Sequence, residues 1–522
     1  MKQFILPLAI LLTLTLLAGC AAPASGKTEA PAAGEPAETG EAGTVTIRFD
    51  GDTVSVQGAD EDAVKVDGTA VTVRRSGEYI LSGRSGSGSV KVKKETRDVT
   101  LVLRGLELTA DGAAPICCNK DTAVRIVAEA GTVNTLADTA ANNADDNPDN
   151  PDAENAVIKG KDGAVVTLSG AGTLNVTANA KNAIKTGGDL TVRELTLNVT
   201  APNDGVKSDT AIVVGAEGEA GPVLSIGGCT EGMEAPQIDV YSGDLRIEAT
   251  DDGLNAPQGD DGAAIRIHGG RLYADAANGD GLDSNGEVSI TGGELTVFSS
   301  ARADNSPLDT GSTFTLSGGT VLAVGAAGMA QSPNETGGQC YLSFGAGGAG
   351  FGRNQGGLIS IAAGDKIEIL DDAGTVLAET GALRAADYVF YSSAALESGR
   401  TYTLRVGGNE ALTAEATAEG SSFTGLPDME GEPGGFGGKG GQRPEGFNGQ
   451  RPEGELPEGM PELPEGELPE GFEPPEGFNG ERPEPPEGME PPEGFGGRPG
   501  SFGGQGGRRS DSLPDASEDT ET

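Results

Sequence analysis

The chain has 522 residues and a formal net charge of −44, with 85 glycines, 30 prolines, one histidine and no tryptophan. This excess of carboxylates disfavours nucleic acid and anionic lipid as partners. It favours divalent cations, which oxygen ligands bind well. Abundant glycine with short runs of Val, Ile and Thr predicts many short β-strands.

The first twenty residues have the features of an export signal. Lys2 precedes an apolar stretch at residues 4–17, which has the length of a signal-peptide core and is too short for a membrane span. The Leu-Ala-Gly-Cys that ends at Cys20 looks like a bacterial lipobox. We therefore expect residues 1–20 to be a lipoprotein signal peptide with Cys20 acylated, and residues 21–43 to be a flexible tether. These features predict a lipid-anchored protein at the cell surface, with an ordinary secretory signal as the alternative.

Four more cysteines follow, and their spacing is that of neither a disulfide framework nor a zinc motif. They are Cys117, Cys118, Cys229 and Cys340. The first two are adjacent, so in a strand they would point to opposite faces and could not share a metal. We expect these cysteines to fill small apolar spaces in the interior.

The centre of the chain repeats one pattern. Each unit begins with an acidic or amide residue, a small residue and one apolar residue. A polar turn follows, and then come two short alternating strands separated by Gly-Gly or an equivalent. An example is "NGDGLDSNGEVSITGGELTVFSS" (278–300). The apolar anchors recur at roughly 20–30 residues, a period typical of solenoids. They are Ile158, Ile184, Val206, Leu254, Leu282 and Leu308. The gap between Val206 and Leu254 is about twice that period, and we interpret it as including a Gly- and Glu-rich insertion near residues 215–237.

Three strands per unit without helical periodicity predict an all-β fold, a single-stranded parallel β-helix. Hairpins in an antiparallel sandwich are the alternative, and they fit the Gly-Gly corners less well. We expect the β-helix, with N-terminal cap strands, to span residues 44–339, followed by a small C-terminal β-module at 340–418. Residues 419–522 repeat Pro-Glu-Gly units with almost no Val or Ile, which predicts a disordered tail.

Several of these segments resemble one known family. "SGEYILSG" (76–83), "NDGVKSD" (203–209) and "GDGLDSNGEVSITGGELTV" (279–297) are similar to the carbohydrate-binding domain family of bacterial cell-surface lipoproteins. The resemblance covers about residues 64 to 325. It implies a right-handed parallel β-helix shaped like pectate lyases, with calcium as cofactor and polysaccharide as partner. "SPLD" (306–309) departs from the Glu-Gly-Phe-Asp of the family.

Acidic residues beside the anchors would stack in neighbouring coils and repel each other unless lysines, amides or a cation lie between them. Calcium takes about six to eight oxygen ligands and suits this arrangement. The alternative is that the aspartates are Asx-turn residues that accept hydrogen bonds from corner amides. For the whole array we favour calcium, which the resemblance also implies. The expected ligands are Asp204, Asp209, Asp251, Asp252, Asp280, Asp283 and Asp304, and Asp309 has the same place in the last coil.

The residues directly after the anchors form a second column, which changes from basic to acidic along the chain. It runs through Lys159, Lys185, Lys207, Asn255 and Asp283. The first four are candidate carbohydrate-binding residues, with the lysines facing uronate carboxylates. In the alternative, the lysines pair with Asp162, Asp189 and Asp209 and contribute little.

No hydrolase signature is present, and no motif places a base opposite a calcium cluster. His268 lies in an alternating strand and is interpreted as structural, whereas Lys207 and Arg266 would be candidate bases of a lyase. We therefore predict a non-catalytic polysaccharide-binding lipoprotein that contacts the membrane only through its lipid anchor and binds no nucleic acid. A calcium-dependent pectate-type lyase and a passive surface stalk or adhesin are the alternatives.

Overall fold

The computed structural model describes residues 44–60, 62–259, 261–345 and 358–421. The predicted signal peptide with Cys20, the tether and nearly all of the predicted tail lie outside these residues. Within the described part, no helix has the length and apolar character needed to cross a membrane.

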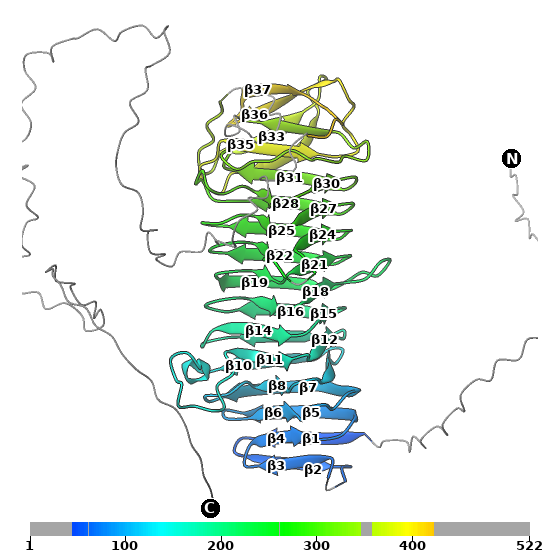
Figure 1. Ribbon diagram of the computed structural model, residues 1–522, viewed down its shortest axis with the longest axis vertical. Coiled ribbons are helices and arrows are strands. Elements are labelled where there is room, and N and C mark those ends of the chain that lie inside the picture. Colours follow the sequence, from blue (N-terminus) through cyan, green and yellow to red (C-terminus); the bar gives the residue numbers. More distant parts are fainter. Residues whose placement is uncertain (1–43, 61, 260, 346–357, 422–522) are drawn as a thin grey trace, which may run out of the picture. The chain divides into compact units, whose positions relative to one another are not determined.

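Most strands form a parallel β-solenoid whose wall has three faces, called here A, B and C (Figure 1). A coil contributes one strand to each face, as in β23 (Leu254–Ala256), β24 (Ala264–Ile267) and β25 (Arg271–Ala276). Each strand pairs in parallel with its counterparts in the coils before and after, so equivalent residues form columns. The expected all-β parallel β-helix is confirmed.

Along each face, the strands are stacked in the order in which they occur in the chain. Face A contains β10 (Val133–Asp138), β13 (Thr173–Thr177), β16 (Thr196–Thr200), β19 (Val223–Cys229), β22 (Asp244–Ala249), β25, β28 (Glu294–Phe298) and β31 (Thr320–Gly325). Face B contains β9 (Ala123–Ala128), β12 (Val165–Ser169), β15 (Leu190–Val192), β18 (Ala211–Val214), β21 (Gln237–Val240), β24, β27 (Glu287–Ile290) and β30 (Phe314–Leu316). Face C contains β6 (Ser89–Val92), β8 (Ile116–Cys118), β11 (Ala156–Asp162), β14 (Asn182–Gly187), β17 (Val206–Ser208), β20 (Met233–Glu234), β23, β26 (Leu282–Ser284) and β29 (Leu308–Thr310). The long strand β7 (Val99–Ala110) pairs with β9 through its first half and with β10 through its second half.

Two hairpins begin the stack. β1 (Val45–Asp50) pairs with β2 (Thr53–Gln57), and β3 (Val64–Asp67) pairs with β4 (Ala70–Val73), both antiparallel. β1 then pairs in parallel with β5 (Gly77–Ser85), and β4 pairs in parallel with β6. The hairpins therefore cover the first coil, whose edge would otherwise offer unpaired backbone groups to another strand.

The predicted anchors form one continuous column inside face C. Ile158 pairs with Ile184, Ile184 with Val206, and Leu254 with Leu282, which in turn pairs with Leu308. All of these side chains are buried in one hydrophobic core that runs through the solenoid. Burial of these apolar columns is the main favourable contribution to the fold.

The long gap between Val206 and Leu254 was interpreted wrongly from the sequence. It holds one more complete coil, made of β20, β21 and β22, and Met233 is its anchor. Met233 pairs with Val206 on one side and with Leu254 on the other, and it is fully buried. Only residues 215–222 form an extended turn, between β18 and β19.

The last strands form a module that continues from face A at the C-terminal end of the solenoid. β35 (Tyr388–Ser392) pairs antiparallel with both β31 and β32 (Tyr341–Phe344). The other strands make a four-stranded antiparallel sheet in the order β34 (Val376–Gly381), β33 (Lys366–Leu370), β36 (Thr401–Val406), β37 (Asn409–Glu415). A second hydrophobic core joins this module to the outer side of face A, where Phe298 and Leu322 are buried. Arg384 of the module also donates hydrogen bonds to Asp275 and to the Ser299 carbonyl group.

Candidate functional site

The repeated acid-glycine-anchor motif has a structural cause at the corner that leads into face C. At Gly281, an added Cβ would lie 2.1 Å from Val297 Cγ1 and 2.6 Å from the Pro307 carbonyl oxygen. At Gly253 it would lie 2.5 Å from the carbonyl oxygen of Gly281 in the next coil. A side chain at either position would therefore push the coils apart, and the motif needs glycine there.

The acid before each glycine links one coil to the next. Asp252 Oδ1 accepts a hydrogen bond of 2.7 Å from the backbone N–H of Asp280, and Asp280 Oδ1 accepts one from the backbone N–H of Ser306. Asn182 Oδ1 accepts the equivalent bond from the Asp204 N–H at 3.2 Å. The alternative considered from the sequence was that these aspartates accept hydrogen bonds from corner amides in local Asx turns. Asp252 and Asp280 do accept bonds from corner amides, but those amides belong to the next coil. This contact uses one oxygen of each carboxylate.

The column after the anchors also stacks as predicted. Lys159, Lys185 and Lys207 pair in register, and Lys207 pairs with Glu234 of the coil that the sequence interpretation missed. The column continues through Asn255 and Asp283 to Asp309. Its outward side chains therefore change from basic to acidic along face C.

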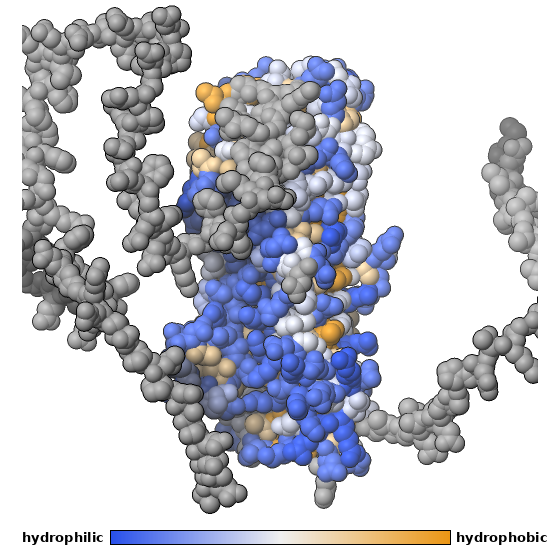
Figure 2. Space-filling view, in the orientation of Figure 1, coloured by the Kyte–Doolittle hydropathy of each residue, from blue (hydrophilic) through white to orange (hydrophobic). Residues whose placement is uncertain are grey.

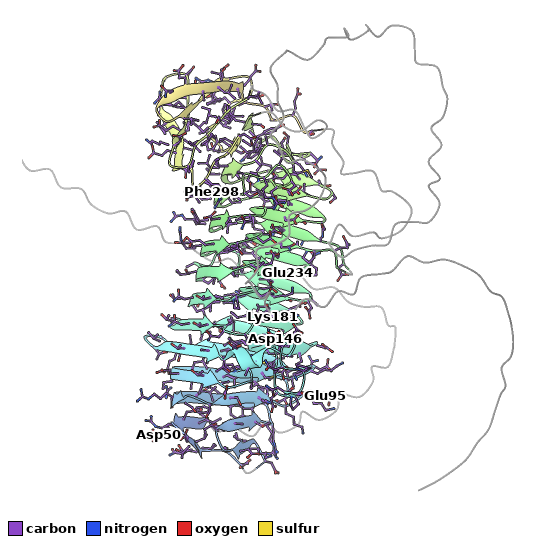
Figure 3. The ribbon with its side chains drawn as sticks, turned by 90° about the vertical axis from the view of Figure 1, so that its left-hand side faces the viewer. Asp50, Glu95, Asp146, Lys181, Glu234 and Phe298 are labelled. Carbon is purple, nitrogen blue, oxygen red and sulfur yellow. The ribbon has the colours of Figure 1, made fainter. Side chains whose placement is uncertain are left out.

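Six carboxylates from four successive coils gather at the acidic end, and we call them the carboxylate cluster. They are Glu231, Glu234, Asp252, Asp280, Asp283 and Asp309. Figure 3 shows Glu234 among the side chains of this side of the solenoid. The exposed Asp251 lies close enough to add its charge to Asp252 and Asp283.

Burial and mutual repulsion disfavour negative charge in this cluster. Burial, followed by repulsion from Asp252 and Asp309, raises the pKa of Asp283 to about 7. The pKa of Asp280 is raised to about 9, chiefly by burial and despite the hydrogen bond from the Ser306 N–H. Burial and the neighbouring charges likewise raise the pKa of Asp252 to about 6. These groups would accept either protons or a cation to relieve the repulsion.

Glu231 is the member that sequence reasoning missed most clearly. Burial and the charges of Asp252 and Asp251 raise its pKa to about 8. Its Oε2 atom is buried and has no hydrogen-bond partner among the described residues. An unsatisfied buried carboxylate oxygen is costly and is a natural ligand atom for a cation. The sequence feature that could have revealed Glu231 is its position two residues before the anchor Met233. Asp252 has the same position relative to the anchor Leu254.

Three other predicted metal ligands have different surroundings. Asp304 is exposed and pairs with Arg302 at 2.7 Å, which lowers its pKa. Asp209 is half exposed and lies 4.0 Å from Lys185. Asp204 is buried, and its Oδ2 lies 3.1 Å from Lys207 Nζ. These three carboxylates therefore have cationic neighbours inside the protein, as does Glu234 of the carboxylate cluster, which lies 2.5 Å from Lys207. The other five members of the cluster form no ion pair with a described residue.

Of the three lysines of the column, Lys207 has close acidic partners, whereas Lys185 has only Asp209 at 4.0 Å. Lys207 Nζ lies 2.5 Å from Glu234 Oε2 in addition to its contact with Asp204, whereas the predicted partners Asp162 and Asp189 contact Lys120 and Thr210 instead. Lys159 is partly buried, and burial followed by repulsion from Lys185 lowers its pKa. Their carbohydrate-binding role, with that of Asn255, stays a prediction.

An acidic loop crosses the basic end of face C. Residues 139–155, which begin with the 3₁₀ helix η1 (Ala140–Asn142), connect β10 to β11. Asp152 pairs with Lys91 at 2.6 Å, Glu154 with Lys161 at 2.6 Å, and Asp145 with Lys181 at 2.5 Å. In Figure 3, Asp146 of this loop and Lys181 lie next to each other on the same side as Glu234. The loop reduces the positive charge that this end of face C presents.

Replacing Lys185 by Met should change the free energy of unfolding by less than about 1 kcal/mol, because its distant partner is half exposed. The matched variant Lys207→Met removes two closer pairs and leaves the buried Asp204 without its cation, so it should be the more destabilising of the two. Chemical denaturation of both variants measures the difference. Equal effects would contradict this account of the column.

The single histidine lies just after β24 rather than within the strand, and its contacts are with neighbouring side chains. His268 is partly exposed at a corner after β24, its Nε2 lies 2.9 Å from Asp239 Oδ1, and its ring stacks on Tyr241 at 4.4 Å. Arg266, a candidate base, contacts Gln237, Asp239 and Glu287. The four cysteines outside the predicted signal are free and buried, as expected for interior packing residues.

The chemistry of the carboxylate cluster fits calcium. It offers hard oxygen ligands, raised pKa values and the orphaned Glu231 Oε2, on a face where Asn255 and backbone carbonyl groups stand nearby. No three His, Cys, Asp or Glu side chains of the described residues are already arranged as a metal site. A cation there would therefore draw on these carboxylates together with carbonyl oxygens and water.

The fold defines the class of this protein, a parallel β-solenoid. The family of carbohydrate-binding domain-containing proteins matches residues 67–221 and 219–341, just over half of the chain. The chain belongs to this family. A carbohydrate-binding domain-containing protein of Acetivibrio thermocellus is 33% identical over 202 residues, which cover 38% of this chain and 65% of that relative. A solved structure, the gadolinium derivative of a polysaccharide lyase-like protein from C. thermocellum, is similar with a TM-score of 0.37 and 25% identity, over 48% of this chain and 90% of that one.

Proposed function

We propose that this protein is a lipoprotein of the cell surface that binds polysaccharide, of acidic or plant-cell-wall type, without cleaving it. Its family is one of carbohydrate-binding domains. The lipobox-like Leu-Ala-Gly-Cys at residues 17–20 supports the surface location. The solenoid would hold a binding face away from the membrane.

Calcium is part of this proposal, and the carboxylate cluster is the observation that carries it. Glu231, Asp252, Asp280 and Asp283 combine burial with raised pKa values. Calcium held between coils would permit ionised carboxylates at this spacing. It would also give sugar hydroxyl and carboxylate groups a cation to bind. Its ligands would come from these four residues, with Glu234, Asp309 and Asn255 beside them.

The charge state of the nearest amine argues against a lyase. Burial lowers the pKa of Lys207, but the hydrogen bond with Glu234 and the charge of Asp204 outweigh it, so the pKa is raised overall. A protonated lysine cannot accept the proton beside a uronate carboxylate. Arg266 is held by three neighbours. Binding without cleavage is therefore the better-supported function.

The test is incubation of the purified protein with polygalacturonate and with neutral polysaccharides in the presence of calcium. We expect retention on at least one polysaccharide and no rise in ultraviolet absorbance. Unsaturated products that absorb in the ultraviolet would show that the protein is a lyase and contradict the proposal. If the protein binds no glycan, the passive stalk becomes the better-supported function.

A further inference from the structure

Two adjoining hollows lie at a corner of the first coils, away from the carboxylate cluster. One has a volume of about 670 Å³ and the other about 540 Å³, and both are lined by Arg74, Arg75 and Lys93. The larger one is also lined by Lys94, Arg97 and the acidic Glu95, and the smaller one by Asp62. The five basic residues, called here the corner cations, come from the turns that precede β5 and β7. In a chain with a net charge of −44, they make a local basic surface.

The corner cations are exposed and mostly lack strong partners. Arg75 makes only long pairs, at 3.7 Å with Asp60 and 3.4 Å with Asp62. Lys94 lies 3.8 Å from its neighbour Glu95. No ion pair links Arg74, Lys93 or Arg97 to a carboxylate within the described residues, which do not include Glu61. This differs from Lys207 of face C, which lies 2.5 Å from Glu234 and 3.1 Å from Asp204.

Backbone hydrogen bonds between coils hold the two turns in place. Ser76 Oγ donates a hydrogen bond of 2.6 Å to the Arg97 carbonyl group, and the Gly77 N–H donates one of 3.1 Å to the Asp98 carbonyl group. The Glu95 N–H donates to the Lys120 carbonyl group of the next coil at 2.9 Å. Glu95 itself has a φ of 65°, a left-handed conformation that is uncommon for such a residue. The cations therefore stand on a fixed base, which lowers the entropic cost of binding.

The polar lining of these two shallow, open hollows indicates the class of ligand. The hydroxyl groups of Thr72, Ser76 and Thr96 line the hollows beside the cations, so the lining offers both charge and hydrogen bonds. Figure 2 shows mainly hydrophilic side chains over the N-terminal coils. A chain with regularly spaced carboxylates and hydroxyl groups fits this lining.

We propose that the corner cations form a binding site for carboxylated polysaccharide, separate from the calcium-dependent face. This inference rests on the proposed polysaccharide-binding function and places the recognition of acidic polysaccharide at a second site. It assigns that recognition to Arg74, Lys93 and Arg97 rather than to the lysines of face C. Because these cations are exposed, salt should weaken the binding.

The test uses the full-length protein and its triple variant Arg74→Ala, Lys93→Ala, Arg97→Ala, titrated with polygalacturonate, with fully methyl-esterified pectin and with phosphatidylglycerol vesicles. Wild type should bind polygalacturonate more tightly than the esterified polymer. The triple variant should lose roughly tenfold or more in affinity for polygalacturonate, with a weaker dependence on salt. Its melting temperature should stay unchanged, because the replaced side chains are exposed.

A matched control removes the same charge elsewhere, through Arg48→Ala, Arg84→Ala and Arg271→Ala. These residues are exposed and line neither hollow, and Asp50, which pairs in register with Arg84, lies on the side opposite Glu95 in Figure 3. Equal losses in both triple variants would overturn the inference, since net charge alone would explain the binding. Unchanged polygalacturonate affinity in the test variant would overturn it while leaving polysaccharide binding intact. If the test variant loses affinity for the vesicles alone, the inference is overturned in favour of a lipid surface. If the wild-type protein binds no glycan, the proposed function is contradicted as well.

Discussion

At pH 8, with free calcium about a hundredfold above its dissociation constant, bound calcium should stabilise the folded protein by about 3 kcal/mol. Removing the calcium is expected to lower the free energy of unfolding by that amount. At pH 5 the loss should be much smaller. The reason is the carboxylate cluster, where Asp280 has a pKa of about 9 and Asp283 a pKa of about 7. Calcium needs these groups ionised, so protons compete with it at low pH.

The sign of the pH dependence without metal follows from the same shifts. An unfolded chain releases the aspartate protons near pH 4. The folded protein keeps them up to about pH 6 for Asp252 and about pH 9 for Asp280. Between these limits the folded state binds more protons than the unfolded state, so stability falls as pH rises. Calcium should suppress this fall, and melting curves at pH 5 and pH 8 with calcium or chelator measure it.

The variant Asp280→Asn with Asp283→Asn should lose most of the calcium response and be more stable than wild type in chelator at pH 8. The control is Asp209→Asn with Asp304→Asn, which removes two sequence-predicted ligands that lie beside Lys185 and Arg302. It should keep the response. If the control loses the response and the cluster variant keeps it, the ions bind elsewhere.

Replacing Met233 by Ala is expected to destabilise the protein by about 2–5 kcal/mol. The Met233 side chain is fully buried between Val206 and Leu254, and its truncation leaves a cavity in the apolar column. Denaturant unfolding gives the difference. The control is Ser225→Ala on the neighbouring β19, an exposed position where a change within about 0.5 kcal/mol is expected. A loss below 1 kcal/mol for Met233→Ala would contradict the account of this coil.

The sequence was sufficient to predict most of the solenoid, because the position of an anchor is fixed by its neighbours in the column. Ile184, Leu254 and Leu282 share the acid or amide, the small residue and the turn, and they stack as predicted. Met233 was missed because its motif, Glu231-Gly232-Met233, has glutamate in place of aspartate and methionine in place of a branched anchor. The extended turn at residues 215–222 also disguised the period. Methionine fills the same interior space as the branched residues, so the fold tolerates the change.

The candidate site was predictable only where residues keep a constant offset from the anchor. Asp280 lies two positions before Leu282 and Asp283 one position after it, and both belong to the carboxylate cluster. Asp209 and Asp304 lie in turns, where the backbone path decides the direction of the side chain. The corner cations belong to no repeat, and only stacking of the first coils brings Arg74 beside Lys93.

The most direct test is equilibrium binding of a retained polysaccharide by the full-length variant Arg74→Ala, Lys93→Ala, Arg97→Ala, which lacks the proposed second site, titrated once with saturating calcium and once with chelator. Binding of calcium and of polysaccharide at one face should be coupled, so chelation should reduce the affinity by roughly tenfold or more. The polymer should be recovered at its original length after the titration. Equal affinity in calcium and chelator, or shortened polymer with unsaturated ends, would contradict a calcium-dependent, non-catalytic binding face.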